Sequence, residues 1–251
     1  MDYKHYLPGL IAGTSEIMIF HPFETIGKRI MNKKPNLGYY ESVFMNKPII
    51  NLYKGIGFAG LYRIPQRIYK FGFQPVVFKW VNNKYGENKI RNSFLSGSIV
   101  GACETVLVPL DIIKIKAQTN NLNQGLYSLV KNNPKSLFRG INYSFIRGSI
   151  SSSCLFGVKA MSDEYFKDYS KIKKHMIGSS LAGTTAVILA SPFDVLKTRT
   201  QTGTYTGNVF IQLVKTEGIR GLFLGIVPKT IIISPKLIFS FFVASCVQDI
   251  M

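Results

Sequence analysis

The chain has 251 residues, of which 46% are hydrophobic and 18% are charged, and its mean hydropathy is positive. Its 31 basic and 13 acidic residues give a formal net charge of +18, which predicts anionic partners. The basic residues stand singly and at the ends of apolar segments, and no zinc-finger, RNP-like or basic-zipper spacing occurs. This distribution argues against nucleic acid as a partner. It favours a membrane protein whose charges face water or a polar cavity.

Patterns for catalysis and for metal binding are missing from the sequence. The cysteines, Cys103, Cys154 and Cys246, follow neither a CxxC nor a metal-ligand spacing. There is no glycine-rich phosphate loop with its lysine and no nucleophile elbow, and the histidines are scattered. We therefore expect no enzyme activity, no metal and no cofactor. The N-terminal segment resembles neither a secretory signal nor a transit peptide, so we expect any targeting information to be internal.

A proline motif recurs three times with a period of about 85 residues. Its copies are PFETIGKR at 22–29, PLDIIKIK at 109–116 and PFDVLKTR at 192–199. A second landmark follows each copy: LYKG at 52–55, LFRG at 137–140 and LFLG at 222–225. Two landmarks with one period predict three repeats, which we place at 1–88, 89–171 and 172–251.

Each repeat predicts a first helix that contains the proline, a short amphipathic segment, and a second helix after the landmark glycine. The first helices are expected over 6–32, 92–118 and 176–201. Proline lacks a backbone donor and clashes with the preceding turn, so the motif prolines should kink these helices. The prolines are Pro22, Pro109 and Pro192. Glycines four residues apart favour close helix packing in lipid, and they occur as Gly9 with Gly13 and Gly97 with Gly101.

A helix of about 20 mostly apolar residues spans the ~30 Å hydrocarbon core of a membrane. The six expected helices all carry isolated charges, which are costly in lipid unless they face an aqueous cavity. We therefore predict an all-α membrane protein with six transmembrane helices, in three pseudo-symmetric repeats around a central cavity. The alternative is a soluble helical solenoid, but apolar strings such as TAVILASPF would leave it without polar outer faces.

The repeated motif resembles the signature of the mitochondrial carrier family. That signature is Pro-x-[Asp/Glu]-x-x-[Lys/Arg]-x-[Lys/Arg], followed by [Asp/Glu]-Gly-x4-aromatic-[Lys/Arg]-Gly. Repeats two and three match its first part in full, and repeat three also carries the acid–glycine pair at Glu217 and Gly218. Repeats one and two lack that pair. The resemblance spans the whole chain and implies transport by alternating access across the mitochondrial inner membrane.

The resemblance also implies a gate of ion pairs on the matrix side, in which the acid of one repeat meets the base of the next. The expected pairs here are Glu24 with Lys114 and Asp111 with Lys197. Asp194 should then meet a base of repeat one.

Repeat one departs from this pattern. Gly27 stands where the other two repeats have a gate lysine, so the third link is either unmade or passed to Lys28. Gln118 and Gln201 resemble the glutamines that brace such pairs in the family, and Met31 takes that place in repeat one.

The family has a second gate on the cytoplasmic side, built from an aromatic-acid-x-x-base pattern on each second helix. The matching positions here are Gln74 and Phe78, Lys159 and Asp163, and Ala244 and Gln248. At most one of these pairs offers opposite charges. We therefore expect a weak cytoplasmic gate that opens easily.

In the family, the second helices read the substrate midway down the cavity. The matching positions here are Tyr62–Arg63, Arg147–Gly148 and Ile232–Ile233. An arginine at such a position resembles carriers of oxo-acids, and 64–73 resembles the Pro-x-Arg-x-x-Lys-Phe string of oxodicarboxylate and citrate carriers. The leading expectation is therefore an anionic oxo- or dicarboxylate. The expected substrate-binding residues are Arg63, Arg67, Lys70, Arg147, Gly148 and Ile232.

Three alternatives stay open. These bases could pair with Glu16 and Glu104 instead of a solute, and proton-coupled transport becomes possible if either acid titrates in the cavity. A nucleotide, such as ATP and ADP or a deoxynucleotide, fits the bases equally well, with Tyr69 and Phe73 available for stacking on its base. The chain could also be a degenerate carrier that no longer transports.

The expected partners are a small anionic solute and membrane lipid, including anionic lipids such as cardiolipin, but no nucleic acid. We expect a monomer. An even number of spans places both termini on one side, and Lys33, Lys34 and Lys47 agree with a matrix location for the first connecting segment.

Overall fold

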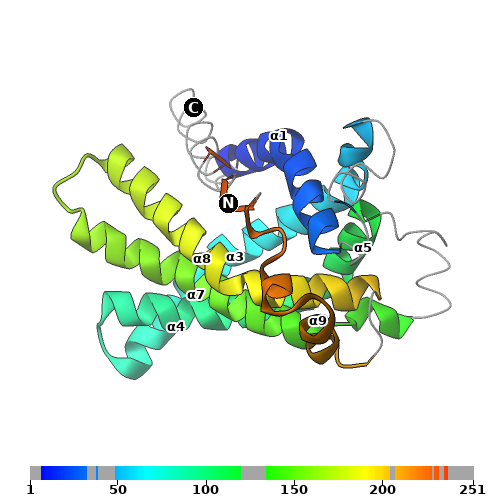
Figure 1. Cartoon of the computed structure of the whole chain (residues 1–251). Helices are drawn as coiled ribbons and strands as arrows, with labels where there is room; N and C mark the ends of the chain where they lie inside the picture. Colours follow the sequence, from blue (N-terminus) through cyan, green and yellow to red (C-terminus); the bar gives the residue numbers. More distant parts are fainter. Residues whose placement is uncertain are drawn as a thin grey trace.

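The computed structural model describes residues 7–32, 38, 49–119, 134–203, 207–227, 229–231 and 235–236, some of them by backbone alone (Figure 1). Every regular element in this part of the chain is a helix. The α-helices are α1 (Leu7–Met31), α3 (Ile56–Tyr85), α4 (Lys89–Cys103), α5 (Val108–Gln118), α7 (Ile141–Tyr165), α8 (Lys171–Thr202) and α9 (Val209–Glu217). Short 3-10 helices are η2 (Ile49–Tyr53), η3 (Glu104–Leu107), η4 (Pro134–Phe138) and η5 (Ile219–Phe223). Most of the expected second helix of repeat three lies outside the described residues.

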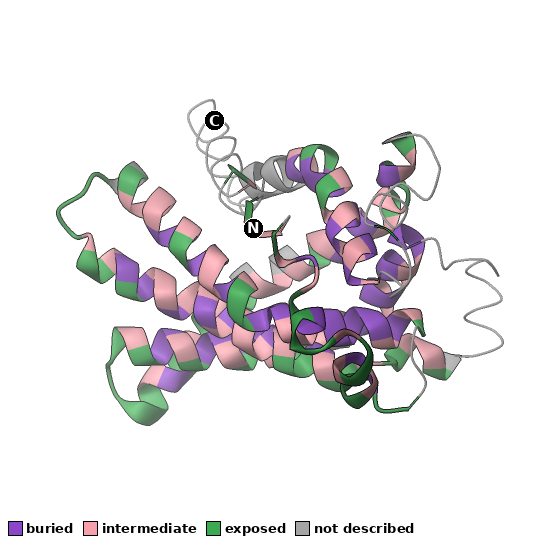
Figure 2. Ribbon diagram, viewed as in Figure 1, coloured by how far each residue is buried: buried purple, intermediate pink, exposed green. Residues whose placement is uncertain are grey.

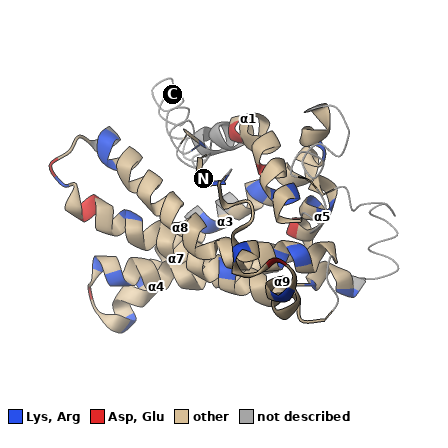
Figure 3. Cartoon of the chain, in the orientation of Figure 1, with Lys and Arg blue, Asp and Glu red and all other residues tan. Residues whose placement is uncertain are grey.

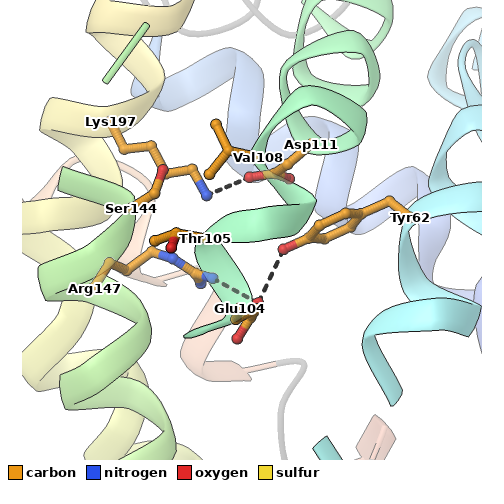
Figure 4. Close-up of a pocket in the computed structure, with 8 residues that line it drawn as sticks. All are labelled: Tyr62, Glu104, Thr105, Val108, Asp111, Ser144, Arg147 and Lys197. Carbon is orange, nitrogen blue, oxygen red and sulfur yellow. Dashed lines mark hydrogen bonds and ion pairs between the residues drawn. The ribbon is translucent and has the colours of Figure 1, made fainter. Parts of the chain in front are cut away.

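The motif prolines stand at bends or breaks of the first helices. Pro22 lies inside α1 and Pro192 inside α8, and Figure 1 shows that both helices change direction along their length. The expected helix over 92–118 is helical throughout, but η3 separates α4 from α5 as a single 3-10 turn, and Pro109 stands in the first turn of α5. Proline removes a hydrogen-bond donor, and the tighter 3-10 turn accommodates its ring there. Glu104 lies in this 3-10 turn, between Tyr62 of α3 and Arg147 of α7 (Figure 4).

Helices α4 and α7 pack at backbone contact. A Cβ atom on Gly101 would overlap the carbonyl oxygen of Gly148, and one on Gly97 would overlap the backbone of α7. The close packing predicted from Gly97 and Gly101 is therefore present. The surroundings of Gly9 and Gly13 lie outside the described residues.

The landmark glycines join the repeats in a cycle. All three have left-handed backbone angles, with φ of 84° at Gly55, 75° at Gly140 and 77° at Gly225, which glycine adopts without strain. Each packs against the first helix of another repeat: Gly55 against Ala117 of α5, Gly140 against Thr200 of α8, and Gly225 against Met31 of α1. The start of each second helix thus lies beside the end of the next repeat's first helix.

Charge and apolarity are distributed as in a bundle that faces lipid. Large apolar side chains point outward, with Val106 80%, Met18 66% and Leu61 61% exposed. Many charged side chains are buried. Figure 2 shows that the buried positions gather where α5 and α8 approach each other. Figure 3 shows long uncharged stretches on α7 and α8. By length and apolarity alone, one helix within the described residues, Lys173–Thr202, could cross a membrane. The arrangement fits helices that turn their charges away from lipid.

Candidate functional site

A polar pocket lies between four helices at the centre of the described bundle (Figure 4). Its lining comes from α3, η3, α5, α7 and α8: Tyr62, Glu104, Thr105, Val108, Asp111, Ser144, Arg147 and Lys197. The pocket therefore joins residues expected to hold substrate with residues expected to form the matrix gate.

Glu104 is the centre of one cluster of charges. Its carboxylate lies 2.8 Å from Lys70 Nζ and 3.4 Å from Arg147 Nη2. Tyr62 Oη donates a hydrogen bond to Glu104 Oε1 at 3.0 Å, and Gln66 Nε2 donates another to the same oxygen. Two expected substrate-binding bases are thus held by an internal acid, which is the alternative that the sequence left open.

Glu16 and Glu24 share a second cluster on the facing side of α1. Lys236 Nζ lies 2.8 Å from Glu16 Oε1 and 2.7 Å from Glu24 Oε1. Arg63 forms ion pairs with both carboxylates, at 3.5 Å from Glu16 and directly with Glu24. Lys114 Nζ lies farther from Glu24 Oε2, at 3.9 Å. Glu24 therefore takes most of its cations from second helices.

The expected gate residues form pairs around the same centre. Lys197 forms a direct ion pair with Asp111, and both side chains are buried. Asp194 is reached by three cations: Lys229 Nζ at 2.5 Å, Arg147 Nε at 3.7 Å and Lys28 Nζ at 3.8 Å. The three acids of the repeated motif are thus each paired in this state.

Comparison with known proteins places this site in a family. The sequence model of the mitochondrial carrier protein family matches twice, over residues 86–170 and 168–251. The chain belongs to the mitochondrial carrier family. Membership means that the fold is a six-helix transmembrane bundle, and that the protein is a multi-pass transporter of the mitochondrial inner membrane and not an enzyme.

Individual carriers are similar along nearly the whole chain. The mitochondrial GTP/GDP carrier protein 1 of Saccharomyces cerevisiae is 33% identical over 93% of this chain and 89% of its own length. An uncharacterized mitochondrial carrier of Schizosaccharomyces pombe is 34% identical with the same coverage. The mitochondrial citrate transporter D of Aspergillus niger is 26% identical over 92% of this chain and 88% of its own length.

The expected glutamine braces of this carrier differ from one another. Gln118 is buried and its Nε2 donates to Thr25 Oγ1 at 3.4 Å, beside Glu24. Gln201 is equally buried, but neither atom of its amide has a hydrogen-bond partner within the described residues. In repeat one, Met31 sulfur lies 3.9 Å from Lys28 Nζ.

Several expected site residues lie elsewhere or outside the description. Gly148 stands in the backbone contact with α4, which gives it a packing position that the motif did not reveal. The side chain of Arg67 and the whole of Ile232 lie outside the described residues. At the expected cytoplasmic gate, Asp163 Oδ1 has no hydrogen-bond partner among the described residues, and the positions at 244 and 248 are not described.

Sequence reasoning missed Lys229 as a site residue. The signal was present, because Lys229 stands four residues after Gly225, where the other repeats have Ala59 and Ser144 at the same offset from their landmark glycines. Only one of these three equivalent positions holds a base, and the chain lacks the gate base at position 27. These two observations together identify Lys229.

Proposed function

We propose that this mitochondrial carrier exchanges nucleoside di- and triphosphates, with guanine nucleotides as the first candidates. The observation that carries the proposal is an excess of cations in the central ion-pair network. Among the described side chains, eight bases and five acids belong to it. The bases are Lys28, Arg63, Lys70, Lys114, Arg147, Lys197, Lys229 and Lys236, and the acids are Glu16, Glu24, Glu104, Asp111 and Asp194.

A polyphosphate suits this excess better than a dicarboxylate, because its chain carries more negative charge and more acceptor oxygens. The similarity to a GTP/GDP carrier at 33% identity, against 26% for a citrate transporter, supports the same choice. The leading expectation of the sequence, an oxo- or dicarboxylate, therefore becomes the second candidate.

Arg147 and Lys70 are the proposed phosphate contacts. Both form ion pairs with Glu104, at 3.4 Å and 2.8 Å. A phosphate that enters the cavity competes with this carboxylate, and a guanidinium can hold it through two parallel hydrogen bonds. Arg147 also lies 3.7 Å from Asp194. Cargo that draws Arg147 away would therefore remove one cation from a gate acid as it binds.

The proposed matrix gate consists of Glu24, Asp111, Lys114, Asp194 and Lys197. Gln118 is the proposed brace of the Glu24–Lys114 pair. Glu16 and Glu104 remain candidates for proton coupling, since both are buried carboxylates within the network. Tyr69 and Phe73 are the proposed stacking residues for the base of the nucleotide, and Phe73 is 46% exposed. The rings of Tyr69 and Phe73 stack on each other at 5.4 Å, and Tyr69 packs against the cluster of Val77, Val81 and Val100.

The test is uptake by proteoliposomes that contain the purified carrier. Labelled GTP should enter against internal GDP, whereas 2-oxoglutarate and citrate should neither enter nor compete. Arg147→Ala should abolish uptake and the thermal stabilisation by GTP, while Arg91→Ala, a control on the exposed start of α4, should leave both intact. Uptake confined to carboxylates would establish the second candidate instead. The absence of thermal stabilisation by any of these solutes would favour a carrier that no longer transports.

A further inference from the structure

The third acid of the gate motif has a close cation although its expected partner is missing. Gly27 replaces the lysine that repeat one should contribute, yet Lys229 Nζ lies 2.5 Å from Asp194 Oδ2. We propose that Lys229 is the third gate cation of this carrier, and that position 27 carries no lysine because the Lys229 side chain occupies the path that a long side chain there would take. The proposal concerns the gate and holds for any cargo.

The space beside Gly27 is the first support. A Cβ atom built on Gly27 would lie 3.6 Å from Lys229 Cγ and 4.0 Å from Lys229 Cε, so the aliphatic part of Lys229 runs directly past this glycine. Packed helices leave no room for two long side chains along one path. A lysine at position 27 and a lysine at 229 would therefore exclude each other.

Comparison of the three repeats is the second support. The position four residues after the landmark glycine holds Ala59 in repeat one, Ser144 in repeat two and Lys229 in repeat three. The cyclic packing of the landmark glycines predicts that each of these positions faces the gate position of the next repeat, and Lys229 does lie beside Gly27. Ser144 and Lys197 indeed line the same pocket (Figure 4). Two repeats combine a small residue with a gate lysine, and the third combines a lysine with glycine.

The other two cations near Asp194 are less suited to the role. Lys28 Nζ is 3.8 Å away and donates a hydrogen bond to Thr198 Oγ1 at 3.0 Å. Arg147 Nε is 3.7 Å away, and this side chain also contacts Glu104. Asp194 is the one acid within ion-pair distance of Lys229 among the described residues.

A gate cation at position 229 in place of position 27 changes which repeats the ion pair with Asp194 connects. A lysine at position 27 would tie repeat one to Asp194 of repeat three, as the other two gate pairs tie neighbouring repeats. Lys229 and Asp194 both belong to repeat three by the predicted boundaries. Their pair neutralises the acid without tying two repeats, so it can persist when the matrix side opens. Only the longer Lys28 contact then joins repeats one and three at this gate acid.

The test is the melting temperature of the detergent-purified carrier without added solute. Lys229→Met keeps the apolar part of the side chain and removes the charge, and it should lower the melting temperature by about 5 °C, since it leaves Asp194 with distant cations only. Lys229→Arg should melt like the wild type. Gly27→Lys combined with Lys229→Ser should recover the lost stability, because it reproduces the pairing of a gate lysine with a small residue that repeat two has at Lys197 and Ser144.

The matched control is Gly27→Met combined with Lys229→Ser, which restores bulk without charge and should not recover stability. The proposal is overturned if Lys229→Met melts within about 1 °C of the wild type, or if methionine at position 27 rescues as well as lysine. If Lys229→Met fails to fold, folding of the Gly27→Lys combination supports the proposal and its failure overturns it. In proteoliposomes, a raised KM for GTP with unchanged stability in Lys229→Met would assign Lys229 to cargo instead. The melting comparison contains no solute, so it stands even if GTP is not transported.

Discussion

Glu104→Gln tests the idea that the Glu104 carboxylate competes with the cargo for Lys70 and Arg147. The substitution keeps the shape of a side chain that is only 5% exposed, and removes the charge that holds Lys70 at 2.8 Å and Arg147 at 3.4 Å. Removing one partner of a buried ion pair costs about 3–5 kcal/mol. Arg147 keeps Asp194 at 3.7 Å, so the lower end of that range applies, about 3 kcal/mol. For a chain of this size we expect a melting temperature about 6–12 °C lower.

The same substitution should strengthen cargo binding. With the competing carboxylate gone, Lys70 is released and Arg147 keeps only its contact with Asp194, so phosphate meets less competition. A gain of about 1.4 kcal/mol would lower the dissociation constant for GTP about tenfold. Thermal unfolding in detergent, measured with and without GTP, follows both effects in one experiment. Glu164→Gln is the control, because its contact with Lys167 is 3.9 Å long and exposed, and such pairs contribute about 0–1 kcal/mol. A Glu104→Gln protein that melts like the wild type, or that GTP stabilises less than the wild type, would refute this reasoning.

Two further substitutions test the packing of α4 against α7 and the buried ion pair of Arg199 with Glu217. Gly101→Ala should destabilise the carrier by about 3 kcal/mol, because its Cβ would overlap the backbone of α7 and neither backbone can yield; Gly57→Ala, with open space around it, should have little effect on the melting temperature. Arg199→Met should also cost about 3 kcal/mol, since the fully buried Arg199 donates to both carboxylate oxygens of Glu217, at 2.8 and 3.1 Å. Arg220→Met, at an exposed position, is its control. Equal melting temperatures for the two arginine variants would contradict a stabilising role of the Arg199–Glu217 pair.

Much of the organisation was accessible from the sequence because it repeats. A motif that returns three times places its acids and bases at equivalent points of three helices, so neighbours around a ring must face one another. On that argument Asp111 was expected beside Lys197 and Glu24 beside Lys114, and the structure brings both pairs together. The functional role of these pairs and the boundaries of the three repeats stay predictions.

Local backbone events were less accessible. The motif marks each of its prolines as a perturbation of a helix, but Pro22 and Pro192 lie inside the α-helices α1 and α8, whereas Pro109 follows the 3-10 turn η3 between α4 and α5. Whether a proline bends or breaks a helix depends on which groups take up the freed carbonyls. Gly148 also has a packing role that the motif could not indicate, because the Gly101 that it packs against lies on another helix.

The choice of partner within a crowded network was the least accessible of all. Asp194 has three bases within 4 Å, and Glu24 also has three, namely Arg63, Lys114 and Lys236. Periodicity identifies the faces from which such bases come, but lysine and arginine side chains are long enough to reach past their own helix. Which base comes closest then depends on the small residues that leave a path, such as Gly27 beside Lys229. In a charged cavity the positions of glycine and alanine therefore determine the ion pairs as much as the charged residues do. Comparison of equivalent positions in the internal repeats identifies these small residues.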